Sequence, residues 1–475
     1  MWMVVIMDVS RRGFLTATAG VAASAVVTQI PQAKAASRKI LRARSRQIEV
    51  AGKAATRYGL EQDSGVFGLT LDEGDQFDIQ LVNELSVDTS IHWHGMEEPW
   101  QQDGVPYLSA LPITSGGRAD YSFPALPTGT RWMHSHFGLQ EQNLLAAPLI
   151  IRDKVAQAED AQEVVMFLED FSWTSPEEIF ANLRKPKPEM SMSKESDKKV
   201  GPDLNDVEFD AFLANDRTLD DPDVVAVEKG GKIRVRIINA SASSNYTLDF
   251  GSLEGELIAV DGNPVIPFKA STFPLAIAQR ADIMITMPSD GAAVPVLAHC
   301  EGRKMRSGII LRPKGAKAAK ISTVTETEGP RVALEQEEKL RAARPLTGRK
   351  KVRSVPVDLT GSMSSYIWNM GVEGLSGLPV VIRKGKRVEL VMVNKTPMSH
   401  PMHLHGHSFQ VVGINGQRLQ GAMRDTVLVP PKTTVTVALD TRNPGLWAFH
   451  CHNLYHLAAG MFSTMAYREI PRSSS

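Results

Sequence analysis

The chain has 475 residues, with 53 basic and 53 acidic side chains, a formal net charge of zero and a sequence pI near 7.2. At roughly 150 residues per domain, this length predicts about three domains. The balanced charge argues against a polyanionic partner, so neither nucleic acid nor a charged membrane surface is an expected ligand.

The N-terminal residues 1–37 have the features of an export signal. Arg11 and Arg12 precede a weakly apolar, alanine-rich stretch, and the small residues around Lys34 form a cleavage site. The pattern Ser-Arg-Arg-x-Phe-Leu resembles a twin-arginine signal, which usually serves proteins that cross the membrane folded. We therefore predict a periplasmic protein that uses the twin-arginine export machinery and is not stably inserted in the membrane after the signal is removed. The true start is either Met1 or Met7, and an uncleaved anchor is the disfavoured alternative.

Three similar segments recur along the chain. They are DEGDQFDIQLVN ending at Asn83, EKGGKIRVRIIN ending at Asn239 and RKGKRVELVMVN ending at Asn394. Each places a glycine turn before alternating or β-branched residues, which predicts a turn leading into a half-buried strand. Each is followed by a second similar segment, GTRWMHSH, AVPVLAHCE or GLWAFHCH. Three homologous β domains explain these repeats.

Helical periodicity is scarce, and glycine, proline and asparagine separate the strand-like runs, as in sandwiches with Greek-key connections. We predict an all-β fold with domains at residues 38–155, 156–318 and 350–475. Residues 319–349 are polar and lysine-rich and are expected to form an interdomain linker with room for a short helix. Residues 184–206 are charged and contain prolines, and are expected to be a surface loop of the middle domain.

Ten of the twelve histidines fall into four short clusters: HWHG at 92–95, HSH at 134–136, HPMHLH at 400–405 and HCHNLYH at 450–456. Two histidines on one strand face are common in ordinary cores, but four clusters in two matching repeats favour a metal site. Because residues i and i+2 of a strand share a face, His450 and His452 are expected to face one site and Cys451 another.

A thiolate with two imidazoles and a weak axial methionine is the ligand set of a blue-copper electron-transfer site. Cys451, His456, Met461 and the upstream His400 supply this set. Eight histidines remain, enough for a multinuclear cluster, and the two that flank Cys451 would join both sites through a few covalent bonds. The only other cysteine, Cys300, would then be a lone buried thiol.

These motifs resemble those of three-domain multicopper oxidases of the laccase superfamily, and HSHFGLQEQ, NKTPMSHPMHLHGHSF and LYHLAAGMF resemble bacterial CopA-type copper-resistance oxidases. The resemblance implies three cupredoxin-like domains and four copper ions: one type 1, one type 2 and two type 3. By motif position the type 1 ligands are His400, Cys451, His456 and Met461; the type 2 ligands are His92 and His403; and the type 3 sets are His94, His134 and His452, and His136, His405 and His450.

The middle repeat lacks the complete motif. His299 and Cys300 align with His450 and Cys451, but Glu301 replaces the following histidine and no histidine lies upstream. We therefore interpret the middle domain as a copper-free spacer. His407 is expected to have a local structural role.

The implied reaction couples one-electron oxidation of a substrate at the type 1 site to four-electron reduction of dioxygen to water at the trinuclear cluster. We expect Cys451, His450 and His452 to carry electrons, and Asp103, at a position where the family usually has an acid, to supply protons. The acid that many laccase relatives carry between the last histidine and methionine is absent, because residues 457–459 are Leu-Ala-Ala.

Two substrate classes stay open. Soft thioethers favour Cu(I), and Met398, Met402 and Met363 are candidates for a cuprous-ion site, with a core role as the alternative for each. The long methionine-rich tracts of many copper-resistance relatives are absent, and Met190 and Met192 are a poor remnant. Phenols or aromatic amines could instead react at an exposed edge of His456. A periplasmic copper-binding protein without turnover is the alternative to an enzyme.

Overall fold

The computed structural model describes residues 38–185, 204–348 and 352–470. The predicted export signal and the pair Met190 and Met192 therefore lie outside the described residues. Within the described ranges, no helix combines the length and apolar character that a membrane span requires.

The first domain consists of two four-stranded sheets that share one hydrophobic core. One sheet has the order β2-β1-β4-β6, formed by β1 (Lys39–Val50), β2 (Lys53–Gln62), β4 (Gln76–Asn83) and β6 (Arg118–Pro124). The other has the order β3-β8-β7-β5, formed by β3 (Leu69–Asp72), β5 (Ile91–His94), β7 (Gly129–Ser135) and β8 (Ala146–Arg152). A 3-10 turn, η1 (Trp100–Gln102), and the short helix α1 (Lys154–Ala158) complete it.

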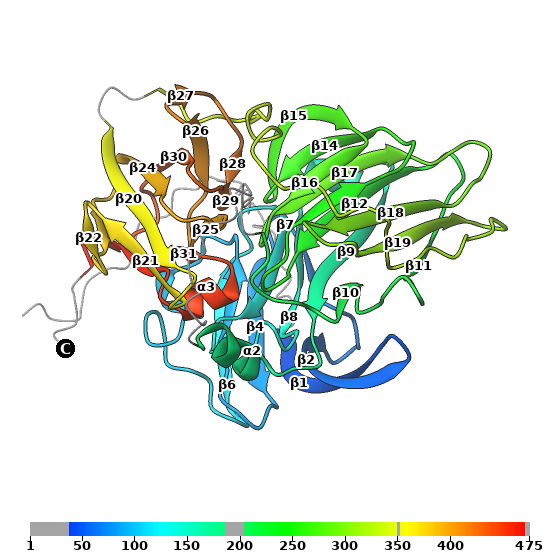
Figure 1. Cartoon of the computed structure of the whole chain (residues 1–475), viewed down its shortest axis with the longest axis horizontal. Coiled ribbons are helices and arrows are strands. Elements are labelled where there is room, and N and C mark those ends of the chain that lie inside the picture. Colours follow the sequence, from blue (N-terminus) through cyan, green and yellow to red (C-terminus); the bar gives the residue numbers. More distant parts are fainter. Residues whose placement is uncertain (1–37, 186–203, 349–351, 471–475) are drawn as a thin grey trace, which may run out of the picture. The chain divides into compact units, whose positions relative to one another are not determined.

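The middle domain, green in Figure 1, is a larger sandwich. Its six-stranded sheet has the order β10-β9-β12-β17-β14-β15, formed by β9 (Gln162–Phe171), β10 (Ala211–Ala214), β12 (Lys232–Asn239), β14 (Gly255–Val260), β15 (Asn263–Ala270) and β17 (Arg280–Thr286). Its five-stranded sheet has the order β11-β19-β18-β13-β16, formed by β11 (Val224–Val227), β13 (Tyr246–Asp249), β16 (Thr272–Leu275), β18 (Val294–Cys300) and β19 (Arg306–Pro313). Helix α2 (Pro176–Leu183) follows β9.

The last domain is yellow to red in Figure 1. One sheet contains β20 (Arg353–Ser362), β21 (Ile367–Val372), β22 (Leu375–Ser376), β24 (Arg387–Asn394), β26 (Phe409–Ile414), β27 (Gln417–Arg418), β28 (Met423–Arg424) and β30 (Thr434–Asp440). The other has the order β23-β32-β31-β25-β29, formed by β23 (Val380–Ile382), β25 (His400–Leu404), β29 (Thr426–Val429), β31 (Leu446–Cys451) and β32 (Phe462–Tyr467). Helix α3 (Leu454–Ala458) follows β31.

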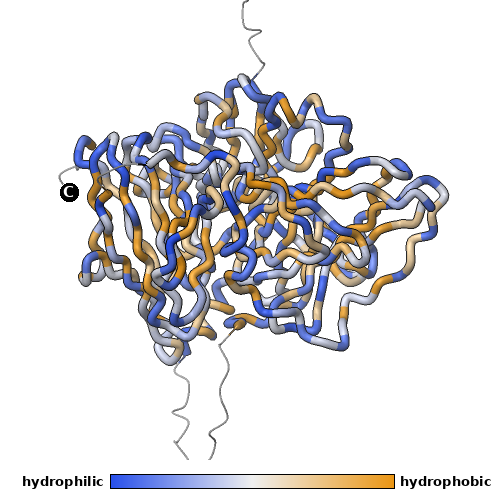
Figure 2. Tube along the Cα trace, turned by 90° about the horizontal axis from the view of Figure 1, so that it is seen from above, coloured by the Kyte–Doolittle hydropathy of each residue, from blue (hydrophilic) through white to orange (hydrophobic). Residues whose placement is uncertain are grey.

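All three sandwiches repeat one topology. The first long strand of each lies parallel to the strand of the repeated motif, in the pairs β1 with β4, β9 with β12 and β20 with β24. Buried and more exposed side chains alternate along β4 and β24, because successive side chains point to opposite faces of the sheet. Figure 2 shows hydrophobic and hydrophilic residues interspersed along the Cα trace. The predicted all-β architecture is confirmed.

A buried asparagine ends the repeated strand in each domain. The side-chain nitrogens of Asn83, Asn239 and Asn394 each donate to two backbone carbonyls of neighbouring segments. The side-chain oxygen of each accepts from the backbone N–H two residues further on. Since a buried amide must be hydrogen-bonded, this shared arrangement explains why asparagine recurs at the end of the motif.

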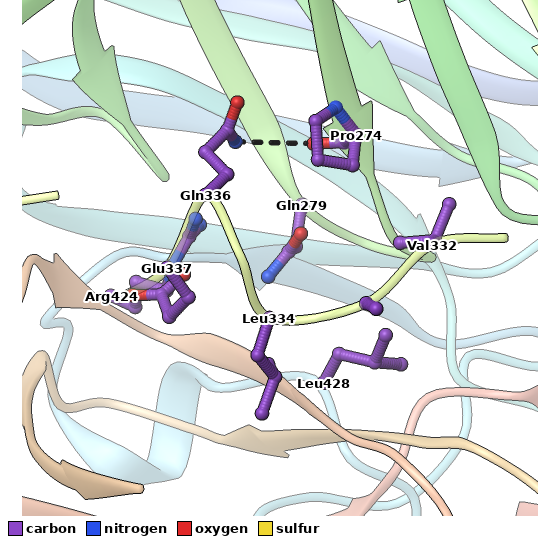
Figure 3. A pocket seen from close by; sticks show the side chains of 9 residues that line it. Pro274, Gln279, Val332, Leu334, Gln336, Glu337, Arg424 and Leu428 are labelled. Atoms are coloured by element: carbon purple, nitrogen blue, oxygen red, sulfur yellow. Dashed lines mark hydrogen bonds and ion pairs between the residues drawn. The ribbon is translucent and has the colours of Figure 1, made fainter. Parts of the chain in front are cut away.

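The predicted linker is described as far as residue 348 and forms turns and single bridges there, with no helix between residues 319 and 348. Figure 3 shows a part of it that lies between two domains: Gln336 Nε2 donates to the carbonyl of Pro274 (3.3 Å), and Glu337 accepts from Arg424 Nε (2.7 Å). The linker is therefore bonded to both the middle and the last domain.

Candidate metal centres

A sulfur-containing site lies within the last domain. Cys451 Sγ is 3.6 Å from Nδ1 of His400 and 3.6 Å from Nδ1 of His456, and these two nitrogens are 3.1 Å apart. Met461 is held beside them by the backbone, because Cys451 N donates to the Met461 carbonyl (3.1 Å) and Met461 N donates to the His456 carbonyl (3.0 Å). All four side chains are fully buried.

Local hydrogen bonds shape this site. The Asn453 side chain caps α3 by accepting from the N–H groups of Tyr455 and His456, which turns the chain back toward Cys451 directly after β31. On the far side of the imidazoles, His400 Nε2 is 2.7 Å from the Thr396 hydroxyl and His456 Nε2 is 2.7 Å from an oxygen of Asp206. Both rings therefore present Nδ1 to the sulfur.

A second site gathers eight histidines from the first and last domains. They lie in or directly after β5, β7, β25 and β31, and are His92, His94, His134, His136, His403, His405, His450 and His452. Strand register sets neighbours opposite one another, with His92 facing His134 and His403 facing His450. Rings from different domains stack: the ring centroids of His92 and His405, and of His94 and His403, are 3.7 Å apart.

Carboxylates hold the outer nitrogens of this histidine cluster. Asp103 lies 2.9 Å from His92 Nδ1 and 3.1 Å from His405 Nδ1. Asp425 lies 3.0 Å from His94 Nε2, and Glu141 lies 2.9 Å from His134 Nδ1. A carboxylate behind an imidazole fixes which nitrogen carries the hydrogen and so leaves the opposite nitrogen as an acceptor.

The imidazole nitrogens that face the centre of the histidine cluster are suited to binding metal ions. Among the histidines of this cluster, the buried nitrogens without a hydrogen-bond partner within the described residues are His92 Nε2, His94 Nδ1, His134 Nε2, His403 Nε2 and both nitrogens of His452. An unpartnered buried polar atom is costly, and neutral imidazole is a good ligand for copper. The donor atoms of His136, His405 and His450 all lie within 4.8 Å of one another, as do those of His400, Cys451 and His456.

Burial keeps these groups in their uncharged forms. It lowers the pKa of His94, His403 and His405 well below the usual range, with neighbouring imidazoles adding to the effect. Burial also raises the pKa of the Cys451 thiol, so a thiolate at this position needs a cation beside it. Neutral imidazoles and a thiol that ionises only with a cation are suited to metal binding.

The phenol alternative requires an exposed edge of His456, but His456 is fully buried. Its outer nitrogen is covered by Asp206, whose same oxygen accepts from the hydroxyl of Tyr366 (2.6 Å). Asp206 belongs to the end of the stretch expected to be a surface loop, yet its side chain is fully buried. That stretch is described only at its two ends, and the C-terminal end contributes to the sulfur site.

The three methionines considered for Cu(I) differ in burial. Met398 and Met402 lie in the hydrophobic core, and Met402 pairs with Cys451 between β25 and β31. Met363 is partly buried and packs against this core.

The middle domain contains the predicted lone thiol. Cys300 is buried and unpaired, and the neighbouring His299 lies 3.3 Å from Asp249. His407 bridges the carbonyl of His405 (2.9 Å) and the hydroxyl of Tyr467 (2.7 Å), in keeping with a local structural role.

The sequence analysis did not identify Glu141, Asp425 or Asp206 as site residues. Glu141 follows the HSH motif by five residues, so a search for acids near histidines would have found it. Asp425 and Asp206 are remote in sequence from the histidines that they contact, and nothing in the local sequence distinguishes them.

Known proteins match this chain along most of its length. Three family models described as multicopper oxidase match residues 44–156, 180–309 and 350–470. The multicopper oxidase MmcO of Mycobacterium tuberculosis is 31% identical over 408 residues, covering 83% of this chain and 80% of the relative. Copper resistance protein A of Escherichia coli is 26% identical over 528 residues, covering 84% of this chain and 87% of the relative.

Solved structures share the fold. The crystal structure of a laccase from Botrytis aclada has a TM-score of 0.72 at 23% identity, covering 90% of this chain and 87% of that structure. The crystal structure of Fet3p, a multicopper oxidase that functions in iron import, has a TM-score of 0.73 at 18% identity and covers 90% of both chains. The predicted cupredoxin-like sandwiches are confirmed, and with a sulfur site and a histidine cluster in place the chain belongs to the multicopper oxidases, oxidoreductases that use oxygen.

Proposed function

We propose that the chain takes single electrons from a reductant at the sulfur site and delivers them to dioxygen at the histidine cluster. The observation that carries this proposal is that Cys451 lies in the sulfur site while its neighbours His450 and His452 lie in the cluster. When bound, the copper ions would supply one-electron exchange at the sulfur site and, at the cluster, the four electrons that reduce dioxygen to two waters.

Four copper ions are proposed, with the ligand roles that the sequence predicts. His400, Cys451, His456 and Met461 would hold type 1 copper, and His92 and His403 type 2 copper. The type 3 pair would be held by His94, His134 and His452 on one side and by His136, His405 and His450 on the other. Support comes from ring centroids 5.8, 5.1 and 4.9 Å apart in the first type 3 set and from donor atoms within 4.8 Å in the second.

The chain itself provides the path between the sites. His450 Nδ1 donates to the carbonyl of Cys451 (2.9 Å), because a carbonyl oxygen can only accept. This bond leaves His450 Nε2 for the cluster, where it lies 3.0 Å from His405 Nε2 and 3.3 Å from His136 Nε2. Electrons leaving the sulfur therefore need to cross only a peptide unit and one side chain.

Asp103 is the proposed source of protons at the cluster. It is fully buried and contacts both His92 and His405. Glu98, also buried, lies beside it, and burial together with the charge of Asp103 raises the pKa of Glu98 well above its usual range. A carboxyl group that stays protonated next to Asp103 could replenish it.

Cuprous ion is the proposed substrate in preference to phenols. Outer-sphere oxidation of a phenol needs an accessible imidazole edge, whereas His456 is covered by Asp206 and Tyr366. Cavities of about 1040 and 420 Å³ are lined by residues of both the first and the last domain, but none of these three residues lines either. The carboxyl group of Asp206 beside His456 favours a small cation, and the partly buried thioether of Met363 in the adjoining turn suits Cu(I).

Oxygen uptake by the copper-loaded protein tests the substrate. We expect Asp206→Asn to lower kcat/KM for a Cu(I) complex by about tenfold, equivalent to ~1.4 kcal/mol, and to leave turnover of a substituted phenol unchanged or faster. Tyr366→Phe is the matched control, since it removes the hydroxyl that binds Asp206 but keeps the carboxylate.

The variant Met398→Ala tests whether a thioether near the sulfur site contributes to oxidation of the Cu(I) complex. Fast phenol turnover with poor use of Cu(I) by the wild type would identify a laccase instead.

Cys451→Ser tests the two-site arrangement itself. We expect it to abolish the intense blue absorption and oxygen uptake, because a hydroxyl does not replace a thiolate as a soft copper ligand. Cys300→Ser is the control at the aligned position of the middle domain and should keep both properties. A blue, active Cys451→Ser protein would refute the assignment.

A copper-binding protein without turnover is the second candidate, although every ligand position of the family motif is filled. The distinguishing experiment replaces His94: an oxidase would keep its blue colour and stop consuming oxygen. A protein without turnover would consume none before the substitution.

We also propose export to the periplasm by the twin-arginine route, on the basis of Arg11 and Arg12. Lysine at both positions should retain the protein in the cytoplasm, as cell fractionation would detect.

A further inference from the structure

A buried arginine of the middle domain connects all three domains. Arg280 begins β17 and has no exposed surface. Its Nη1 and Nη2 donate to the two oxygens of Asp425 in the last domain (2.7 and 2.5 Å). Its Nε donates to the carbonyl of Thr130 in the first domain (3.2 Å), and Nη1 also donates to the carbonyl of Ala278 (3.0 Å).

Asp425 in turn orients the histidine cluster. One of its oxygens lies 3.0 Å from His94 Nε2, and since a carboxylate accepts, Nε2 carries the hydrogen and Nδ1 does not. The Thr426 hydroxyl donates to the same oxygen (2.9 Å) and lies 3.1 Å from His403 Nδ1. His94 Nδ1 and His403 Nε2 are the nitrogens left without partners.

The guanidinium is suited to this role in charge and in shape. Asp425 is buried, and a buried carboxylate is stable only with a paired cation. The planar fork of arginine fixes both oxygens at once, which a lysine cannot do. Packing around the pair is tight, because a Cβ at Gly95, next to His94, would lie 2.6 Å from Arg280 Nη2 and 2.7 Å from Asp425 Oδ2.

We propose that Arg280 is a positioning residue for the copper cluster, acting through Asp425 to present Nδ1 of His94. The inference rests on the proposed function, in which His94 binds copper. It gives the middle domain a part in the metal site, although that domain supplies none of the proposed ligands.

The test compares Arg280→Met and Arg280→Lys with Arg236→Met. Arg236 is equally buried, lies on the adjacent strand β12 and pairs with Asp282 (2.6 Å), and within the described residues it bonds to no histidine. Each purified variant is loaded with copper and dialysed against a chelator series. Copper per chain, blue absorption, the electron paramagnetic resonance of the cluster copper and circular dichroism are then measured.

We expect Arg280→Met to weaken binding of the cluster copper by about 10- to 100-fold, the usual effect of losing an outer partner of a metal ligand, with blue absorption per chain unchanged. Arg280→Lys should give a smaller loss of copper affinity.

Equal copper loss in Arg280→Met and Arg236→Met would show that Arg280 has only a structural role and would overturn the proposal. If Arg280→Met does not fold, Arg280→Lys decides: unaltered cluster resonance and copper affinity would overturn it. A wild-type protein that binds no cluster copper would instead refute the proposed function.

Discussion

At the scale of single residues, buried carboxylates lie behind several imidazoles of the histidine cluster. Asp103 lies behind His92 and His405, and Glu141 lies behind His134, with its second oxygen 3.8 Å from His452 Nδ1. Burial raises the pKa of Glu141 well above the usual range, because the charged form loses its hydration at this buried position. On the proposed assignment, these carboxylates orient the imidazoles that would hold copper.

Glu141→Ala should remove the carboxylate behind His134 and leave the Ser135 carbonyl (3.1 Å) as the remaining acceptor for its Nδ1. We expect copper affinity of the cluster to fall by about 10- to 100-fold, while Glu141→Gln keeps more affinity because its amide oxygen can still accept from Nδ1. Copper titration followed by metal analysis measures the effect. Glu301→Ala serves as the control, since Glu301 is a buried acid of the middle domain bonded to Asn245 and to the N–H of Val332. Equal losses in both alanine variants would contradict a specific role for Glu141.

At the scale of elements, the cluster histidines lie in or directly after adjacent strands, and one glycine allows a loop to pack closely against strand β5. The loop after η1 crosses β5 so closely that a Cβ at Gly104 would lie 1.8 Å from the carbonyl oxygen of Ile91. The same approach places the Asp103 carbonyl 3.0 Å from His92 Nδ1. Gly104 also has a φ of +79°, which L-residues rarely adopt.

Gly104→Ala should therefore disturb both the fold and the copper cluster. Gly116→Ala is the matched control, because its φ is +73° but nothing lies within 4 Å of its Cβ position. We expect the control to show only the backbone cost of about 1–2 kcal/mol, and Gly104→Ala to exceed it and to lose cluster copper. Thermal unfolding with metal analysis measures both effects, and identical behaviour of the two variants would show that the close approach is unimportant.

Strands and the clustering of histidines could be predicted at this scale because their signals are local. The alternation in RKGKRVELVMVN predicted the strand that became β24, and the spacing in HWHG and HCH predicted histidines on one strand face. The partners Asp425, Asp206 and Arg280 could not be predicted, because each meets its histidine or carboxylate across a domain boundary. Such contacts depend on how sandwiches pack, and no local periodicity encodes them.

At the scale of the whole molecule, buried polar bonds join the middle domain to the last. The Asp170 carboxylate accepts from the N–H groups of Ala242 and Ser243 and from the hydroxyl of Ser244. The segment that it orders then binds the chain after His452, since Leu454 N donates to the carbonyl of Ala242 (2.9 Å). Burial is the largest influence on Asp170 and raises its pKa from 3.8 to about 6 despite these bonds.

This shift predicts a pH dependence of stability. Because the folded state binds the proton more tightly than the unfolded state, the contribution of Asp170 is greatest below pH 3.8 and is lost as pH rises through about 6. We expect the unfolding free energy of the wild type, relative to Asp170→Asn, to fall by about 3 kcal/mol between pH 3.5 and 7.5. Denaturant unfolding of both proteins at several pH values measures this difference. A difference that is constant or rises with pH would contradict it.

The order of the strands along the chain has a consequence for biosynthesis. The histidine cluster draws half of its rings from β5 and β7 and half from β25 and β31, with the entire middle domain between them. A nascent polypeptide cannot bring these halves together until its last sandwich has emerged from the ribosome. In the proposed copper enzyme, the complete set of cluster ligands is therefore available to metal only after the last sandwich has been synthesised.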